Sequence, residues 1–172
     1  MAYDSATNQV VLVSAESENM TWVWSGTDWH AMSGGPFINS SPELAYDPTS
    51  KSLLMTQDNG LAGDAPMWAW NGSSWHQLAA TVPDAYCWIF ATDYAANDIV
   101  CAAEHGGTFV WSDGGWVRGH ADSDPNVRSY AGGAYASTTH RVVEFGGLIG
   151  PQNNITAEMD AWDASSWVSL PS

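Results

Sequence analysis

The chain has 172 residues and a formal net charge of −15, because nineteen acidic residues stand against only four basic ones. This balance excludes a surface that binds nucleic-acid phosphates; solubility is its first explanation and a cation-binding surface its second. The sequence has no apolar run of about 18 residues, which excludes a membrane-spanning helix. It opens without a basic segment followed by an apolar stretch, so we expect no secretion signal.

Tryptophan pairs with a constant spacing of five residues organise the chain. The pairs are Trp24 and Trp29, Trp70 and Trp75, Trp111 and Trp116, and Trp162 and Trp167. A second signature precedes each pair, at Ala2-Tyr3, Ala45-Tyr46, Ala91-Thr92 and Ala134-Tyr135. Repeats with a period in the forties are typical of stacked blades or solenoids. The sequence therefore predicts four copies of one unit, at approximately 1–33, 44–79, 86–119 and 132–171.

Each repeat predicts four short strands, because alternating apolar residues are separated by turn residues and no helical period appears. The first two repeats predict strands at 1–3, 10–13, 21–24 and 29–32, and at 44–46, 52–56, 67–70 and 75–78. The last two predict strands at 88–92, 99–102, 108–111 and 116–118, and at 133–135, 141–145, 159–162 and 167–170. The fold class is therefore all-β, with four four-stranded antiparallel sheets.

The paired tryptophans are expected to be core residues, because a four-stranded sheet must cover its faces by stacking on its neighbours. Burying one such ring contributes about 2–3 kcal/mol. The expected core residues are Trp24, Trp29, Trp70, Trp75, Trp111, Trp116, Trp162 and Trp167. Two further tryptophans, Trp22 and Trp68, are candidates for stacking on a ligand. Phe109 and Asp160 take their place in the other repeats, so the fold constrains that position less.

The loop between the second and third strands of each repeat varies in length, and such insertions gather on one face, often the binding face. These loops supply the remaining candidate ligand- or partner-binding residues, which are Asp58, Asp64, Glu104 and His105. Cys87 and Cys101 fall on two strands joined by a turn near Tyr94. A cross-strand disulfide and a pair of buried free thiols both remain open.

The pattern Ala-Tyr-Asp, turn, Val-Val-Leu, loop, Trp-x-Trp-x-Gly-x-x-Trp resembles kelch-type repeats over the whole chain. It is closest to the bacterial kelch-like kind and to the central propeller of galactose oxidase. The double glycine of kelch repeats survives as Gly146-Gly147 and Gly106-Gly107, whereas the second repeat keeps only Gly60 and the first has Ser14-Ala15. The resemblance implies blades around a central channel, with the first strand of each repeat innermost.

Kelch propellers usually close with more than four blades, so the resemblance leaves two arrangements open. Either one chain forms a compact four-bladed ring, or two chains form an eight-bladed homodimer, which we favour. An open arc would expose two apolar faces, and pairing two arcs would cover both. Met1 lies directly before the first repeat, so a fragment cut at a repeat boundary and a short natural protein are also both open.

Residues for catalysis are sparse. The histidines lack paired metal-ligand spacing, the only arginines are Arg118, Arg128 and Arg141, and no Gly-x-Ser-x-Gly elbow occurs. We therefore expect no cofactor and no copper, zinc or sialidase-type site. A weak calcium candidate is the loop with Asp122, Asp124 and Asn126, whose oxygens alternate, although a plain acidic turn is the first interpretation.

The sequence thus predicts a non-catalytic propeller module that acts as a structural or recognition scaffold. The alternative is a carbohydrate-binding module of a secreted or cell-envelope protein, and an enzyme has the least support. The expected partners are a second copy of the chain and a protein or glycan ligand. Fold alone does not decide among these functions, because propellers host unrelated activities.

Overall fold

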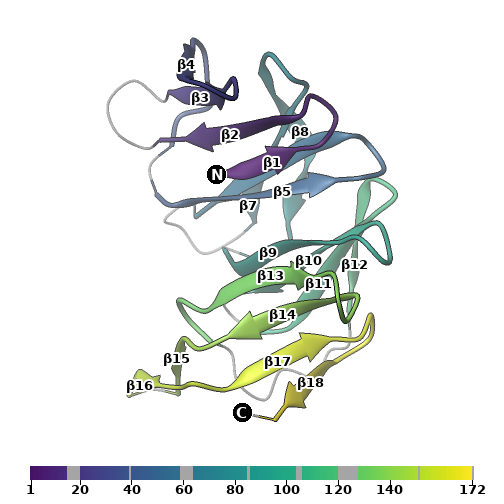
Figure 1. Ribbon diagram of the computed structural model, residues 1–172. Helices are drawn as coiled ribbons and strands as arrows, with labels where there is room; N and C mark the ends of the chain where they lie inside the picture. The colour runs from purple at the N-terminus through teal and green to yellow at the C-terminus, as the bar shows by residue number, and fades with distance from the viewer. Residues whose placement is uncertain are drawn as a thin grey trace. The chain divides into compact units, whose positions relative to one another are not determined.

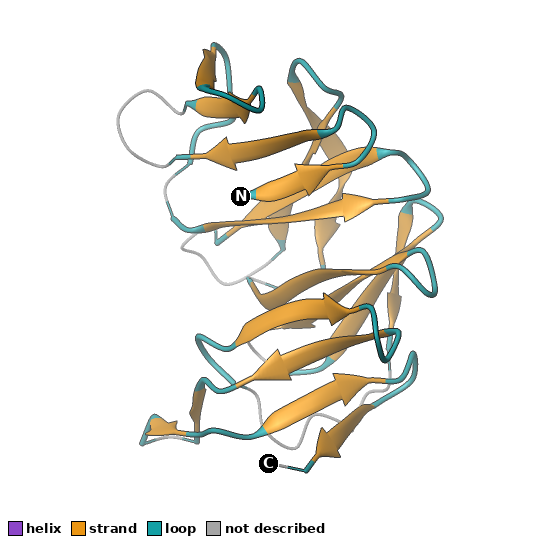
Figure 2. Ribbon diagram, in the orientation of Figure 1, coloured by secondary structure: helices purple, strands orange, loops and turns teal. Residues whose placement is uncertain are grey.

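The computed structural model describes residues 1–14, 20–38, 40–58, 64–84, 86–103, 106–119, 128–150 and 152–171. Within these residues the protein is all-β, which confirms the predicted fold class (Figure 2). Four separate four-stranded antiparallel sheets are present, as predicted, and each is built from strands in sequence order. The chain divides into an N-terminal unit, Met1–Tyr86, and a C-terminal unit, Cys87–Ser172, with two of these sheets in each.

The N-terminal unit holds the first and second sheets (Figure 1). The first sheet consists of β1 (Ala2–Asp4), β2 (Gln9–Val13), β3 (Thr21–Trp24) and β4 (Trp29–Met32). The second consists of β5 (Pro42–Asp47), β6 (Ser52–Gln57), β7 (Ala65–Trp70) and β8 (Trp75–Val82). Because strand neighbours follow chain order, every connection within a sheet is a simple antiparallel return.

The C-terminal unit repeats this plan and adds one small ladder. The third sheet consists of β9 (Cys87–Asp93), β10 (Asp98–Ala103), β11 (Thr108–Ser112) and β12 (Gly115–Arg118). The fourth consists of β13 (Gly132–Ala136), β14 (Arg141–Phe145), β17 (Met159–Trp162) and β18 (Trp167–Leu170). The sequence did not predict β15 (Leu148–Ile149) and β16 (Asn154–Ile155), which pair with each other inside the long loop of the fourth repeat.

The turn after the first strand of each sheet has one design. In three sheets an aspartate ends the strand and its carboxylate accepts a hydrogen bond from the backbone N–H two residues later, as at Asp4, Asp47 and Asp93. The fourth residue after that position is left-handed in every sheet, with φ of 56° at Asn8, 55° at Lys51, 63° at Asn97 and 54° at His140. His140 therefore occupies a position set by the turn, which asparagine fills most easily.

The tryptophan pairs face each other across the hairpin between the third and fourth strands. Their ring centroids are 5.4 Å apart for Trp24 and Trp29, 5.4 Å for Trp70 and Trp75, 5.5 Å for Trp111 and Trp116, and 5.6 Å for Trp162 and Trp167. Tilted and edge-to-face pairs at this distance stabilise antiparallel strands. The five-residue spacing is thus the signature of a hairpin whose flanking strand positions are directly opposite each other.

Successive sheets within a unit pack through a shared set of residues. In the N-terminal unit Tyr46, Leu53 and Trp70 of the second sheet pack against Val11 and Val23 of the first. In the C-terminal unit Val142 and Trp162 of the fourth sheet pack, with Tyr135 and Trp167, against Ile89, Ala91, Val100 and Ala102 of the third. In both units the earlier sheet offers small aliphatic side chains and the later sheet offers a Tyr-Trp-Trp set.

One hydrogen bond is repeated at both contacts. The indole Nε1 of Trp75 donates to Thr21 Oγ1 over 2.8 Å, and the indole Nε1 of Trp167 donates to Thr108 Oγ1 over 2.8 Å. Each threonine opens the third strand of the earlier sheet. This hydrogen bond satisfies the indole N–H and helps to fix the position of one sheet along the next.

The tryptophans expected in the core differ in burial. Trp70, Trp111 and Trp162 are buried, whereas Trp24, Trp75, Trp116 and Trp167 are half-buried. Trp29 is 36% exposed, so it is not a core residue of its unit. The reason is its place on the first sheet, whose Tyr-Trp-Trp face has no earlier sheet in the N-terminal unit to cover it.

Cys87 and Cys101 form a disulfide between β9 and β10. The sequence left this pairing open. The two Cα atoms are 5.3 Å apart, a distance that a disulfide spans without backbone movement. Of the two alternatives, a disulfide and a pair of buried free thiols, the structure shows the disulfide.

Candidate functional site

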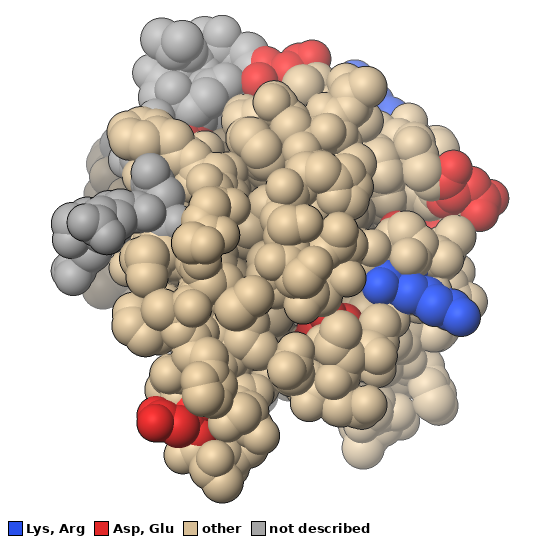
Figure 3. Space-filling model, turned by 90° about the horizontal axis from the view of Figure 1, so that it is seen from above, with Lys and Arg blue, Asp and Glu red and all other residues tan. Residues whose placement is uncertain are grey.

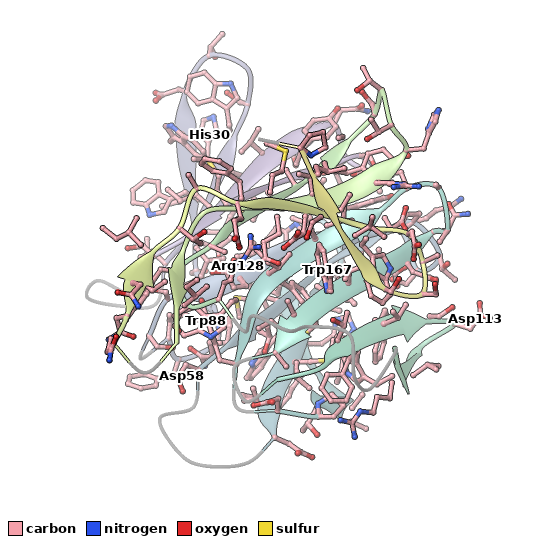
Figure 4. All side chains as sticks on the ribbon, turned by 90° about the horizontal axis from the view of Figure 1, so that it is seen from below. His30, Asp58, Trp88, Asp113, Arg128 and Trp167 are labelled. Atoms are coloured by element: carbon pink, nitrogen blue, oxygen red, sulfur yellow. A yellow bond between two sulfur atoms is a disulfide. The ribbon has the colours of Figure 1, made fainter. Side chains whose placement is uncertain are left out.

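The candidate ligand residues of the N-terminal unit do not form one site. Trp68 packs against a buried cluster of Val13, Ile38 and Met55, so it fills the space between two sheets rather than facing a ligand. Trp22 is half-buried on the first sheet. The backbone carbonyl of Asp58, labelled in Figure 4, accepts a 2.8 Å hydrogen bond from Ser40 Oγ, and the carboxylate of Asp64 accepts a 3.0 Å hydrogen bond from Thr81 Oγ1.

The other candidates from the sequence lie outside the described residues. These are Glu104 and His105, together with the calcium candidates Asp122, Asp124 and Asn126. Within the described ranges no group of three His, Cys, Asp or Glu side chains is placed to hold a metal ion. The same ranges contain no helix of the length and apolarity needed to cross a membrane.

The most unusual side-chain cluster is built around Arg128, to which the sequence analysis gave no role beyond naming it as one of three arginines. Its side chain is 1% exposed and forms an ion pair with Asp160, which is itself largely buried. The same guanidinium contacts the Glu158 carboxylate at 3.3 Å and donates to the Glu158 carbonyl over 3.1 Å. Charges this deep are retained only when they are paired and hydrogen-bonded.

The strand register shows that two acidic side chains lie opposite each other at this position of the fourth sheet. Asp160 of β17 lies opposite Glu144 of β14, and the matching pairs in the other sheets are Leu12 with Trp22, Met55 with Trp68, and Cys101 with Phe109. Three sheets therefore fill this position with apolar side chains and the fourth fills it with two carboxylates. The sequence showed that Asp160 replaces an aromatic residue, but only the fold shows that Arg128 reaches it.

The fourth sheet leaves one apolar face open. Side chains on the side of the sheet opposite its packed face line a hollow of about 490 Å³. They include Ala134, Val143, Phe145, Met159 and Leu170. Phe145 is 53% exposed, and Val168 of the same sheet is 40% exposed. Contiguous exposed apolar surface makes this face a candidate interaction surface.

The first sheet leaves the complementary kind of face open. Tyr3, Trp24 and Trp29 occupy the positions at which Tyr46, Trp70 and Trp75 of the second sheet pack against the first. Tyr3 is 51% exposed and Trp29 is 36% exposed. The first sheet thus presents a Tyr-Trp-Trp set, and the fourth presents a small aliphatic face of the kind that receives such a set.

A second hollow, of about 240 Å³, lies at the turn end of the C-terminal unit. Asp93, His140, Arg141 and Asp163 line it. Asp93 is already bonded to its own turn, and the Asp163 carboxylate accepts hydrogen bonds from Ser165 and Ser166. These hydrogen bonds stabilise the turns that border the hollow.

Electrostatic perturbation is modest in the described residues. Burial raises the pKa of the Glu43 carboxyl above its usual 4.5, while a 2.7 Å hydrogen bond from the Tyr86 hydroxyl opposes that rise. Hydrogen bonds from Ser166 and Ser165 lower the pKa of Asp163 below its usual 3.8. The face shown in Figure 3 is mostly uncharged, with isolated acidic and basic residues.

No model of a known protein family matches the chain, and none of the curated proteins matches it in sequence.

Proposed function

We propose that this protein is a non-catalytic scaffold of the kelch-like propeller type, completed by a second copy of itself. The observation that carries the proposal is the pair of open faces, one on the fourth sheet and one on the first. Within each unit the later sheet packs its Tyr-Trp-Trp face onto the aliphatic face of the earlier one. The fourth sheet of one copy would receive the first sheet of another by the same rule.

The residues at the two faces support this pairing. Trp29 holds the position of Trp75 and Trp167, whose indoles donate to a threonine of the earlier sheet. The corresponding position of the fourth sheet is Met159, which opens β17 as Thr21 opens β3. A methionine thioether packs well against an indole, so the contact becomes apolar. Two such contacts in a two-fold assembly would cover both open faces of both copies.

Light scattering tests the pairing, because one chain has a mass of 18.5 kDa and the assembly has twice that. Met159→Lys and Trp29→Glu should each give the single-chain mass. The two changes in one chain should restore the double mass, because the opposite charges then face each other. Ile155→Glu is the matched control, since Ile155 is 87% exposed on β16, away from the open face.

A wild-type protein that has the single-chain mass at all concentrations would overturn the pairing of copies. The non-catalytic part of the proposal has its own test, which is metal analysis of the purified protein. Stoichiometric copper or zinc would contradict it, whatever the mass.

A further inference from the structure

We propose that Trp88 and Tyr130 form a binding platform for the apolar face of a neutral pyranose sugar. The two ring centroids are 4.8 Å apart and the rings are inclined by 51°. Tyr130 is 75% exposed, and Trp88 is half-buried beside it. This site belongs to the C-terminal unit alone and does not depend on the pairing of copies.

Tyr130 has a backbone conformation that its side chain does not favour. Its φ is 59°, in the left-handed region, which is costly for a bulky residue and free for glycine. A ring that is 75% exposed recovers little of that cost by burial. Strain of this kind concentrates at functional sites, so the exposed ring itself is the feature to explain.

Trp88 also lies at an irregularity of the backbone. The pairing of β9 with β10 passes from Ala102 opposite Ile89 to Ala103 opposite Cys87, so Trp88 is the extra residue of a β-bulge. Bulges re-aim a side chain and are over-represented beside functional sites. The preceding residue, Cys87, is fixed by the disulfide to Cys101.

The two residues before Tyr130 are both anchored. Ser129 exchanges two backbone hydrogen bonds with Leu148 of β15, of 3.1 Å and 2.8 Å. Arg128, labelled with Trp88 in Figure 4, is anchored by Asp160 and Glu158. Both rings therefore start from fixed backbone, and a preorganised aromatic surface loses little entropy when it binds.

An exposed carboxylate that contacts the segment carrying Tyr130 favours a sugar over a proline-rich peptide. Glu158, whose side chain is 58% exposed, contacts Arg128, two residues before Tyr130. An ionised carboxylate only accepts hydrogen bonds, which suits the hydroxyl groups of a sugar. A polyproline segment offers carbonyl acceptors and lacks N–H donors, so it would need donors here instead. The net charge of −15 further disfavours acidic sugars.

Calorimetric titration with cellohexaose, xylohexaose, mannohexaose and chitohexaose tests the platform, and a proline decamer serves as the competing ligand class. At least one of these sugars should bind, and Tyr130→Ala and Trp88→Ala should each weaken it by about tenfold or more. Tyr130→Phe should retain binding. Tyr130→Gly should lose binding while raising the melting temperature, because it removes the strain together with the ring.

Tyr94→Ala is the matched control. Tyr94 is 46% exposed and pairs with Tyr135 at 5.3 Å in the same unit, so it is an exposed, paired aromatic residue outside the platform. The proposal is overturned if none of the four sugars binds, if the Tyr130 and Trp88 variants bind as well as Tyr94→Ala, or if only the proline decamer binds. Since Tyr130→Gly is expected to fold at least as well as the wild type, lost binding in it does not reflect unfolding.

Discussion

The N-terminal and C-terminal units solve the same packing problem with opposite chemistry. In each, a side chain from the segment between two sheets enters the space beside the third strand of the later sheet. In the N-terminal unit it is Ile38, which packs with Met55 and Trp68. In the C-terminal unit it is Arg128, which pairs with Asp160 where Trp68 would stand.

This difference shows what the repeat must keep and what it can exchange. The Tyr-Trp-Trp face and the indole-to-threonine bond are present in both units, so they define the sheet contact. Beside that contact is the space that Ile38 fills in one unit and Arg128 in the other, which we call the wedge. The wedge can be filled by apolar or by charged side chains. An apolar wedge needs no partner, whereas a charged one needs every partner present, and the C-terminal unit should therefore be the more fragile of the two.

The largest expected effect comes from removing the cation. Arg128→Met leaves the buried Asp160 carboxylate without its counter-charge and should cost about 3–5 kcal/mol of unfolding free energy. In the N-terminal unit Ile38→Ala only opens a cavity and should cost about 2–4 kcal/mol. Urea unfolding gives the totals, and amide hydrogen exchange assigns each loss to β14–β17 or to β6–β7.

The control for this comparison rebuilds the N-terminal chemistry in the C-terminal unit. Arg128→Ile, Glu144→Met and Asp160→Trp together should recover wild-type stability or exceed it, because an apolar set of matched volume needs no desolvation of charges. A loss below about 1 kcal/mol for Arg128→Met alone would show that the ion pair is not needed to fill the wedge.

The sequence predicted the sheets that surround the wedge, but it did not predict which side chains fill the wedge. Tryptophan spacing predicted the hairpins and the four sheets, because that spacing is a local property of two paired strands. Asp160 was visible as a break in the repeat, but its partner Arg128 is 32 residues away, in a segment without periodicity. Pairings of this kind come from the stacking of sheets, which local patterns do not encode.

The candidate ligand residues show the same limit. Trp68 was a candidate ligand residue because the residue type at its position varies between repeats. That variation reflects what fills the wedge, and in the N-terminal unit Trp68 is packed against it. Tyr130 carried no signal in the sequence, since a left-handed tyrosine looks like any loop residue before the backbone is known.

The next largest difference between the two units is expected from the disulfide, which belongs to the C-terminal unit. Replacing Cys87 and Cys101 by alanine opens a loop with a sequence separation of 14 residues and should cost about 3 kcal/mol. Exchange protection should fall at β9 and β10 and remain unchanged at β2 and β3, which contain no cysteine. Equal loss of protection in both units would show that they unfold as one, which removes the basis for treating their stabilities separately.

A smaller effect is expected from the hairpin turns. Ala164 has a φ of 71° at the position where the first sheet has Gly26, with a φ of 99°. Ala164→Gly should therefore stabilise the C-terminal unit by about 0.5–1 kcal/mol. Gly26→Ala should destabilise the N-terminal unit by a similar amount, since nothing lies within 4 Å of the added Cβ and only the backbone preference changes. Thermal unfolding of both variants checks the signs, and two shifts in the same direction would contradict this account.

The smallest effects are expected from pH, and they have opposite signs in the two units. The raised pKa of Glu43 means that the folded N-terminal unit binds this proton more tightly than the unfolded chain. Its contribution is therefore fully present below the usual pKa of 4.5 and is lost as the pH rises through the folded pKa. The lowered pKa of Asp163 gives the C-terminal unit a contribution that is present above 3.8 and is lost as the pH falls through the folded pKa.

Two conservative variants isolate the contributions of Glu43 and Asp163, when the free energy of unfolding is measured from neutral pH down to acid pH. Glu43→Gln should remove the gain in stability on acidification towards 4.5, because a neutral amide has no proton to bind. Asp163→Asn should flatten the loss below 3.8 while keeping the turn, since Asn71 makes the same bonds to Ser73 and Ser74 in the second sheet. If Asp163→Asn left the loss of stability below 3.8 unchanged, the hydrogen bonds from Ser165 and Ser166 to this carboxylate would not be its source.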